Sequence, residues 1–180
     1  YFRGPRARST VIVDGLPLQI VGATVRNLLP ERYRRSEATL SGSGALEAGH
    51  TGYARLPSPV TVSRRVEALE DGGLVIEDRL VGSGDHRVEI LFQLGSVRAE
   101  QEGRAPSFRI LDAADRLTAR VEFESQAALT FGLRTGRSFP EEGGWHSPRY
   151  GARMPGLTLV SECVLRDSAR VRARFTFPQG

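Results

Sequence analysis

The stretch that decides the fold is Arg87–Leu94, which reads Arg-Val-Glu-Ile-Leu-Phe-Gln-Leu. In a strand, one face of this stretch carries Val88, Ile90, Phe92 and Leu94, and the other carries Arg87, Glu89 and Gln93. Side chains alternate between the two faces of a β-strand, so this order predicts a strand with its apolar face buried. The same alternation recurs in Leu117–Glu124 and Arg170–Phe177, which predicts further half-buried strands.

Turn residues separate the predicted strands. Asp71-Gly72-Gly73 lies between Val60–Glu70 and Leu74–Leu80 and predicts a hairpin. Glycine-rich segments at 41–44, 82–85 and 141–144 predict loops. Further strands are expected at Thr10–Val13, Thr39–Leu46, Ser107–Leu111, Ala127–Leu133 and Leu157–Leu165. No window of a dozen residues carries an apolar stripe of helical period, so little helix is expected.

Half-buried strands joined by tight turns pair antiparallel, and two such sheets stack on their apolar faces. The sequence therefore predicts an all-β fold, a large antiparallel β-sandwich of about ten to twelve strands. Hydrophobic residues make up 39% of the 180-residue chain, which is enough to bury a core. Neither a linker nor an internal repeat interrupts the chain, so we expect a single domain over residues 1–180.

Composition excludes several classes of function. All 25 basic residues are Arg, they are scattered among 21 acidic residues, and the net charge of +4 does not predict nucleic-acid binding. No apolar run approaches the roughly 18 residues of a membrane span. The one cysteine, Cys163, excludes a disulfide framework and a CxxC zinc site, and its apolar surroundings predict core packing. The chain begins at Tyr1 without a signal peptide, which favours a piece cut from a larger protein.

Two loops carry residue types that suit a ligand. The glycine-flanked loop 143–150 gathers Trp145, His146, Arg149 and Tyr150. Aromatic faces beside an arginine suit a sugar ring that carries an acidic group. The alternative is that Trp145 and Tyr150 close one end of the sandwich. A second loop, 48–53, adds His50 and Tyr53 as binding candidates.

No enzyme motif emerges from the residues alone. His86 begins a strand and is expected at the surface, and Glu141-Glu142 is expected in a solvated turn. The three histidines show neither HxH nor HExxH spacing, so no metal ligand is predicted. GxSxG, P-loop and GxGxxG motifs are also absent, so neither a serine hydrolase nor a nucleotide-binding protein is indicated.

The first fifteen residues carry a family resemblance. The run Ala7-Arg8-Ser9-Thr10-Val11 leads into Val13-Asp14-Gly15. This segment resembles the opening of the C-terminal β-domain of heparinase II/III-type polysaccharide lyases, in which Ala-His-Asn/Ser-Thr-Val leads into Val-Asp-Gly. Later stretches resemble the same family in the same order: His50–Val66, Glu77–Leu94 and Gly144–Pro155. The resemblance covers nearly the whole chain.

The resemblance implies a fold, a reaction and partners. The β-sandwich would pack on an α/α-toroid that lies upstream in the same chain, and the parent protein would be a bacterial, periplasmic or extracellular lyase. Its substrate would be an acidic, uronic-acid-containing polysaccharide cleaved by β-elimination. A base removes the C5 proton beside the carboxylate, an acid protonates the leaving oxygen, and the developing negative charge is neutralised. Most of the catalytic groups would lie on the helical domain, so the isolated domain is expected to be inactive.

Arg8 departs from the family pattern. The family commonly has His after the alanine, linked to a divalent metal, and Arg offers no free lone pair to a metal. The sequence therefore leaves open whether a divalent metal is bound. Arg8 could pair with the substrate carboxylate and supply the positive charge that the metal would otherwise supply. Substrate-binding candidates are Arg8, His50, Tyr53, Trp145, His146, Arg149 and Tyr150. Alternatives are a parent that has lost catalysis, a non-catalytic module that binds acidic glycans through Arg8, Arg149 and Trp145, and a structural β-sandwich. Asp14 is expected to have a structural role.

Overall fold

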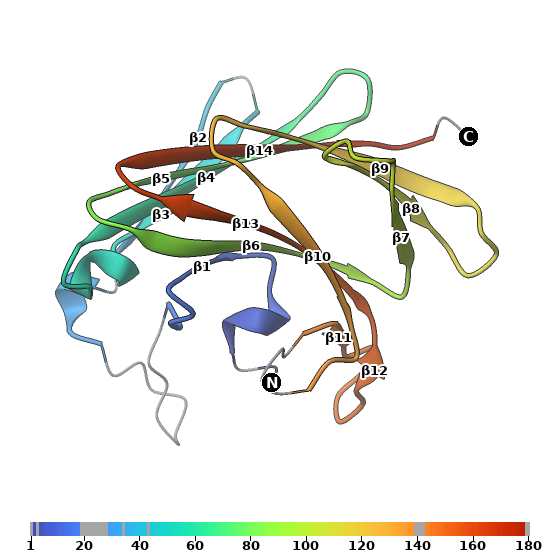
Figure 1. The fold of residues 1–180 in the computed structure, drawn as a ribbon, viewed down its shortest axis with the longest axis horizontal. Helices are drawn as coiled ribbons and strands as arrows, with labels where there is room; N and C mark the ends of the chain where they lie inside the picture. Colours follow the sequence, from blue (N-terminus) through green and yellow to red (C-terminus); the bar gives the residue numbers. More distant parts are fainter. Residues whose placement is uncertain are drawn as a thin grey trace.

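The computed structural model describes residues 2, 4–18, 29–33, 35–42, 44–138 and 143–178. Two stacked antiparallel sheets form the body of the domain (Figure 1). The eight-stranded sheet contains, in spatial order, β2 (Ser36–Leu40), β3 (Leu46–His50), β4 (Val60–Ala68), β5 (Leu74–Gly82), β14 (Ser168–Thr176), β9 (Leu117–Ser125), β8 (Ser107–Leu111) and β7 (Arg98–Gln101). The four-stranded sheet contains β1 (Val11–Val13), β6 (His86–Gly95), β13 (Leu157–Leu165) and β10 (Thr130–Thr135).

Short elements complete the described chain. A two-stranded sheet pairs β11 (Trp145–His146) with β12 (Met154–Pro155). The helical elements of the described residues are 3-10 turns: η1 (Pro5–Ala7), η2 (Glu31–Tyr33) and η3 (Gly52–Arg55). The predicted all-β antiparallel sandwich with little helix is confirmed. The described residues form fourteen strands, of which β11 and β12 are only two residues long, against about ten to twelve expected within an error of two.

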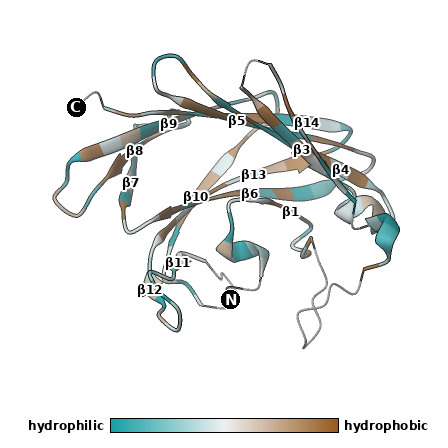
Figure 2. Cartoon of the chain, turned by 180° about the vertical axis from the view of Figure 1, so that it is seen from behind, coloured by the Kyte–Doolittle hydropathy of each residue, from teal (hydrophilic) through white to brown (hydrophobic). Residues whose placement is uncertain are grey.

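The core lies between the two sheets. Val88, Ile90 and Phe92 of β6 face it, as the alternation predicts, and hydrophobic and hydrophilic residues alternate along the long strands in Figure 2. The Phe92 ring meets the rings of Phe123 and Phe175 from the opposite sheet, each with centroids 5.7 Å apart. Edge-on and tilted contacts at this distance are the favoured geometry for aromatic pairs. Cys163 is 6% exposed in this core, which confirms its predicted packing role.

One strand prediction is wrong. Thr39–Leu46 was expected to contain a strand, but β2 ends at Leu40 and β3 begins at Leu46, on either side of the glycine-rich segment 41–44 that was predicted as a loop. The Gly44 N–H donates to the Ser41 carbonyl over 3.0 Å, and Gly44 adopts a φ of 79°, a backbone conformation that glycine tolerates without strain. The predicted hairpin at Asp71-Gly72-Gly73 is confirmed, since the chain turns there between β4 and β5.

Both faces of β6 are covered, which the alternation does not reveal. We call the side of the four-stranded sheet that points away from the eight-stranded sheet the outer face. Ile12, Leu91 and Val160 form a second apolar cluster there, each 0% exposed. The prediction that Glu89 lies on a solvent-facing side is wrong, because Glu89 is 3% exposed on this same face. Figure 1 shows why: the N-terminal segment and β11–β12 lie beneath the four-stranded sheet and add a partial third layer.

The prediction that His86 lies at the surface is also wrong. His86 is 5% exposed, its Nδ1 lies 2.7 Å from Asp14 Oδ2, and its Nε2 lies 3.1 Å from the Ser83 carbonyl. The other Asp14 carboxylate oxygen accepts the Arg87 N–H over 2.9 Å. Asp14 adopts a φ of 52°, so the Val-Asp-Gly turn folds back onto the start of β6. These contacts agree with the structural role expected of Asp14.

Candidate functional site

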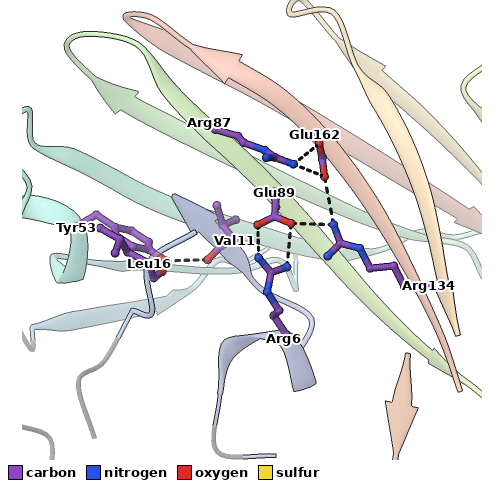
Figure 3. Close-up of polar contacts among 8 residues, drawn as sticks. All are labelled: Arg6, Val11, Leu16, Tyr53, Arg87, Glu89, Arg134 and Glu162. Atoms are coloured by element: carbon purple, nitrogen blue, oxygen red, sulfur yellow. Dashed lines mark hydrogen bonds and ion pairs between the residues drawn. The ribbon is translucent and has the colours of Figure 1, made fainter. Parts of the chain in front are cut away.

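Charged side chains gather on the outer face, from elements far apart in the sequence. Glu89 of β6 and Glu162 of β13 lie opposite each other in the register of the two strands. Arg6 of η1 donates to Glu89 from both terminal guanidinium nitrogens, Nη1 and Nη2, over 2.9 and 2.7 Å. Arg134 of β10 bridges the two carboxylates over 3.0 and 3.3 Å, and Arg87 binds Glu162 over 3.0 Å (Figure 3). We call these five residues the outer-face ion cluster.

Glu89 is the buried centre of this cluster. Its side chain is 4% exposed, whereas those of Arg6 and Arg134 are 22% and 16% exposed. Burial alone would raise the pKa of Glu89, but hydrogen bonds from Arg6 and Arg134 outweigh burial and lower the pKa below its usual value. Three arginines face two glutamates, so the cluster keeps one net positive charge at neutral pH. Among the described residues, Arg134 Nη1 is buried without a hydrogen-bond partner.

The N-terminal segment that carries Arg8 is fastened along this face. The Gln93 side chain donates to the Arg6 carbonyl over 2.9 Å, and the Gln93 N–H donates to Ser9 Oγ over 2.9 Å. Arg64 Nη1 reaches the Ser9 carbonyl from the eight-stranded sheet over 2.7 Å. Arg8 lies between these ties and is exposed. The segment is therefore fixed while the Arg8 side chain faces outward.

The β11–β12 corner is joined to the same segment. Thr158 Oγ1 donates to Gln93 Oε1 over 2.8 Å and accepts the Gly144 N–H over 2.9 Å. Trp145 follows directly in β11. One hydrogen-bonded chain thus runs from the Arg6 carbonyl through Gln93 and Thr158 to the start of β11.

The corner itself mixes buried and exposed candidates. Trp145 is half-buried, its Nε1 donates to the Arg137 carbonyl over 2.9 Å, and the Arg153 guanidinium stacks 4.2 Å from its ring. His146 Nε2 lies 3.1 Å from Ser96 Oγ. Tyr150 is fully exposed in the turn after β11, so it does not close the end of the sandwich. Part of the predicted loop 143–150 is a strand, and Glu141-Glu142 lies outside the described residues.

Tyr53 of η3 has no described contact with Arg8. The Tyr53 ring is 0% exposed, and its hydroxyl lies 3.2 Å from the Val11 carbonyl and 3.1 Å from the Leu16 carbonyl. Burial raises the pKa of Tyr53 to about 12, so it stays protonated at neutral pH. In this arrangement Tyr53 anchors the chain on either side of β1.

His50 ends β3 rather than lying in a loop, which corrects that prediction. Its ring centroid is 5.7 Å from that of Tyr53, and burial lowers its pKa. It also borders an open groove of about 680 Å³ over β2–β5, whose lining includes Thr39, Thr61 and Ser63. The described contacts therefore join the N-terminal segment that carries Arg8 to the β11–β12 corner, and they join His50 to Tyr53 in a second group.

Sequence reasoning missed Glu89, Glu162, Arg134 and Arg6. One signal was present: Leu91 and Val160 are apolar residues on the face that carries Glu89 and Glu162. Apolar residues on both faces of a strand indicate burial from both sides. The Arg6–Glu89 contact itself spans 83 residues of sequence and leaves no local pattern.

The metal implied by the family resemblance does not fit the described part of this chain. The matching ligand position holds Arg8, and no group of three or more His, Cys, Asp or Glu among the described residues could hold a metal ion. His86, whose imidazole contacts the Val-Asp-Gly turn through Asp14, has both ring nitrogens engaged, by Asp14 and by the Ser83 carbonyl. No chemical step is therefore assigned to a metal. The described residues also contain no helix long and apolar enough to cross a membrane.

A comparison with protein families shows which family the chain belongs to. The family described as Heparinase II/III-like, C-terminal matches residues 1–173. The chain belongs to this family. The predicted resemblance is thereby confirmed over residues 1–173. No curated protein matches the sequence.

Solved structures share the fold of this chain. A crystal structure of heparinase III has a TM-score of 0.71 at 13% identity, covering 100% of this chain and 25% of that one. A heparan sulfate lyase, HepC from Pedobacter heparinus, has a TM-score of 0.68 at 12% identity, covering 99% of this chain and 25% of that one. A 4-alpha-glucanotransferase from Thermococcus litoralis shares the fold more distantly, with a TM-score of 0.54 at 14% identity, covering 88% of this chain and 24% of that one. This chain thus spans about a quarter of the length of these structures.

Proposed function

We propose that this chain is the C-terminal domain of a lyase that cleaves a uronic-acid-containing polysaccharide by β-elimination. Family membership over residues 1–173 supports the class of enzyme. The similar structures named heparinase III and heparan sulfate lyase are about four times longer, which supports a further catalytic domain in the parent protein. In this proposal the outer face, with its N-terminal segment, packs on an upstream α/α-toroid and lines the substrate cleft.

The observation that carries the proposal is the placement of Arg8. It occupies the position of the family histidine, on a segment tied to the outer face, and its side chain is exposed. Removal of the C5 proton sends charge toward the neighbouring carboxylate, and a cation held there stabilises the transition state. A guanidinium pairs with a carboxylate through two parallel hydrogen bonds and stays charged at every working pH. Arg8 would therefore supply the positive charge, while the helical domain supplies the acid and the base.

Kinetics of the full-length protein test this role. Arg8→Ala is expected to lower turnover on a uronic polymer by about 100-fold, the usual loss when one group that stabilises developing charge is removed. Arg8→Lys keeps the charge without the fork and is expected to recover part of the rate. Arg104→Ala, at another exposed arginine, serves as the control. Unchanged turnover in Arg8→Ala would refute the proposed role of Arg8 in stabilising the developing charge.

The proposal also predicts what the domain does alone. Residues 1–180 are expected to produce no unsaturated uronate from any uronic polymer, because the acid and the base would lie elsewhere. Release of unsaturated product by the purified domain would refute this division of labour. Periplasmic or extracellular localisation belongs to the same proposal, since a polymeric substrate of this kind is met outside the cytoplasm.

A non-catalytic module for acidic glycans is the second candidate. The observation that favours it is the β11–β12 corner, where Arg153 stacks on Trp145 and Arg149 is exposed. Such a surface binds anionic sugars with an affinity that falls as salt screens the charges. Salt-sensitive binding of a uronic polymer by the full-length protein, without release of unsaturated product, would favour this candidate over the lyase.

A further inference from the structure

We propose that Glu89 is a positioning residue that fixes the place of Arg8 through Arg6. This inference rests on the proposed function of Arg8 and adds a residue that sequence reasoning placed on a solvent-facing strand face. Glu89 touches neither the substrate nor Arg8 in this account. Its carboxylate holds the turn from which Arg8 projects.

Arg8 depends on its main chain for its place. Its side chain is exposed, and among the described residues no ion pair or hydrogen bond of its guanidinium is found. The Arg8 N–H donates to the Pro5 carbonyl over 3.0 Å and closes the η1 turn that contains Arg6. Arg6 and Arg8 therefore belong to one short turn, and a displacement of Arg6 is passed on to Arg8.

Glu89 gives this turn a rigid support. It lies in β6, which pairs with β1 on one side and β13 on the other, so its backbone is held at the centre of the sheet. Its two oxygens meet the two terminal nitrogens of Arg6 in a fork, which fixes orientation as well as distance. Arg134 holds one of the same carboxylate oxygens over 3.0 Å, which limits the rotation of the Glu89 side chain. Figure 3 shows Arg6 reaching up from the turn to this carboxylate.

The remaining ties of the segment do not replace this fork. Gln93 and Arg64 hold the segment mainly on the far side of Arg8, through the Ser9 hydroxyl and carbonyl. On the near side, the Gln93 amide donates to the Arg6 carbonyl over 2.9 Å and to the Arg8 carbonyl over a long 3.5 Å, and both hydrogen bonds are neutral. A charge-assisted fork of two short hydrogen bonds is stronger than these neutral contacts. Loss of the Glu89 charge should therefore free the η1 side of Arg8 while the strand β1 stays in place.

A matched control separates positioning from stability. Glu77 is likewise a buried carboxylate, 5% exposed, with two arginine partners, Arg79 and Arg170. It lies on β5 of the other sheet and has no described contact with the N-terminal segment. Glu77→Gln and Glu89→Gln thus remove the same charge from similar surroundings, and only the second loosens the turn that carries Arg8.

A double-mutant cycle in the full-length protein tests the inference. Glu89→Gln is expected to lower kcat/KM on a uronic polymer by about 10- to 100-fold at a temperature where it is folded, since small misplacements cost rates of this order. In an Arg8→Ala background, Glu89→Gln should change kcat/KM by less than about twofold, because the two residues act through one interaction. Glu77→Gln should lower the melting temperature and leave kcat/KM within about twofold of the parent in both backgrounds.

The outcomes are distinct. Wild-type activity in Arg8→Ala means that the proposed role of Arg8 is wrong, and the inference falls with it. Impaired Arg8→Ala with a multiplicative further loss from Glu89→Gln overturns the positioning role alone. A loss of kcat/KM in Glu77→Gln as large as that in Glu89→Gln also overturns the positioning role. If Glu89→Gln does not fold, Arg6→Met replaces it in the cycle, with Arg6→Lys as the conservative variant expected to recover part of the rate.

Discussion

The role of Tyr53 gives the sharpest prediction about the fold, because the residue was expected to bind substrate. Tyr53→Phe keeps the buried ring and removes only the hydroxyl, which serves the carbonyls of Val11 and Leu16. The single O–H donor that the two carbonyls share is then lost, and Val11 is 3% exposed, so water does not readily replace it. An unsatisfied buried polar group costs about 1–3 kcal/mol.

This loss can be measured in a thermal melt of the 180-residue chain. For a domain of this size, each kcal/mol shifts the melting temperature by about 2–4 °C, so Tyr53→Phe should melt roughly 2–12 °C lower. Tyr150→Phe is the matched control, since Tyr150 is fully exposed and should change the free energy of unfolding by less than about 0.5 kcal/mol. If Tyr53→Phe kept the wild-type melting temperature while the full-length protein lost activity, Tyr53 would be a substrate contact rather than an anchor of the N-terminal chain.

Two further predictions concern Glu89 on the outer face and Gly144 at the start of the β11–β12 corner. The pKa of Glu89 is lowered from 4.5 in the folded state, so its contribution to stability is complete above about pH 4.5 and is lost as pH falls below it. Protonation of Glu89 should therefore lower the free energy of unfolding of the wild type by up to about 1.4 kcal/mol per pH unit on acidification. Urea titrations at several pH values should show a shallower decline for Glu89→Gln, and equal slopes for the two proteins would contradict this prediction. Gly144 and Gly103 both have positive φ, and Gly144→Ala should lower the melting temperature more than Gly103→Ala. A Cβ at Gly144 would lie 2.2 Å from the Arg134 carbonyl oxygen, whereas a Cβ at Gly103 would have no heavy atom within 4 Å. Equal melting temperatures for Gly144→Ala and Gly103→Ala would refute the steric argument.

The sequence predicted the sandwich because its strands are amphipathic. Val88, Ile90 and Phe92 face the core as the alternation requires. The alternation reports which residues share a face, but it does not report what covers the second face. Glu89 was therefore placed in solvent, although the N-terminal segment covers it with Arg6.

The candidate site was only partly within reach of the sequence. Arg8 was found because a motif resemblance marks its position, and Trp145 because unusual residue types gather around it. Glu89 and Arg134 were missed because their contacts join separate strands and a distant segment, and no residue spacing encodes them. His86 was misplaced for the same reason, since its partner Asp14 lies 72 residues away.

We propose that the parent protein is a β-eliminating lyase for a uronic polymer. The most direct measurement incubates the full-length protein with a panel of uronic polymers and a neutral glucan, and follows the ultraviolet absorbance of the unsaturated uronate that β-elimination creates. A β-eliminating lyase should give a steady rise in absorbance with at least one uronic polymer and no rise with the glucan. Binding of uronic polymers with no rise in any of them would contradict the lyase and leave the acidic-glycan module as the function of this domain.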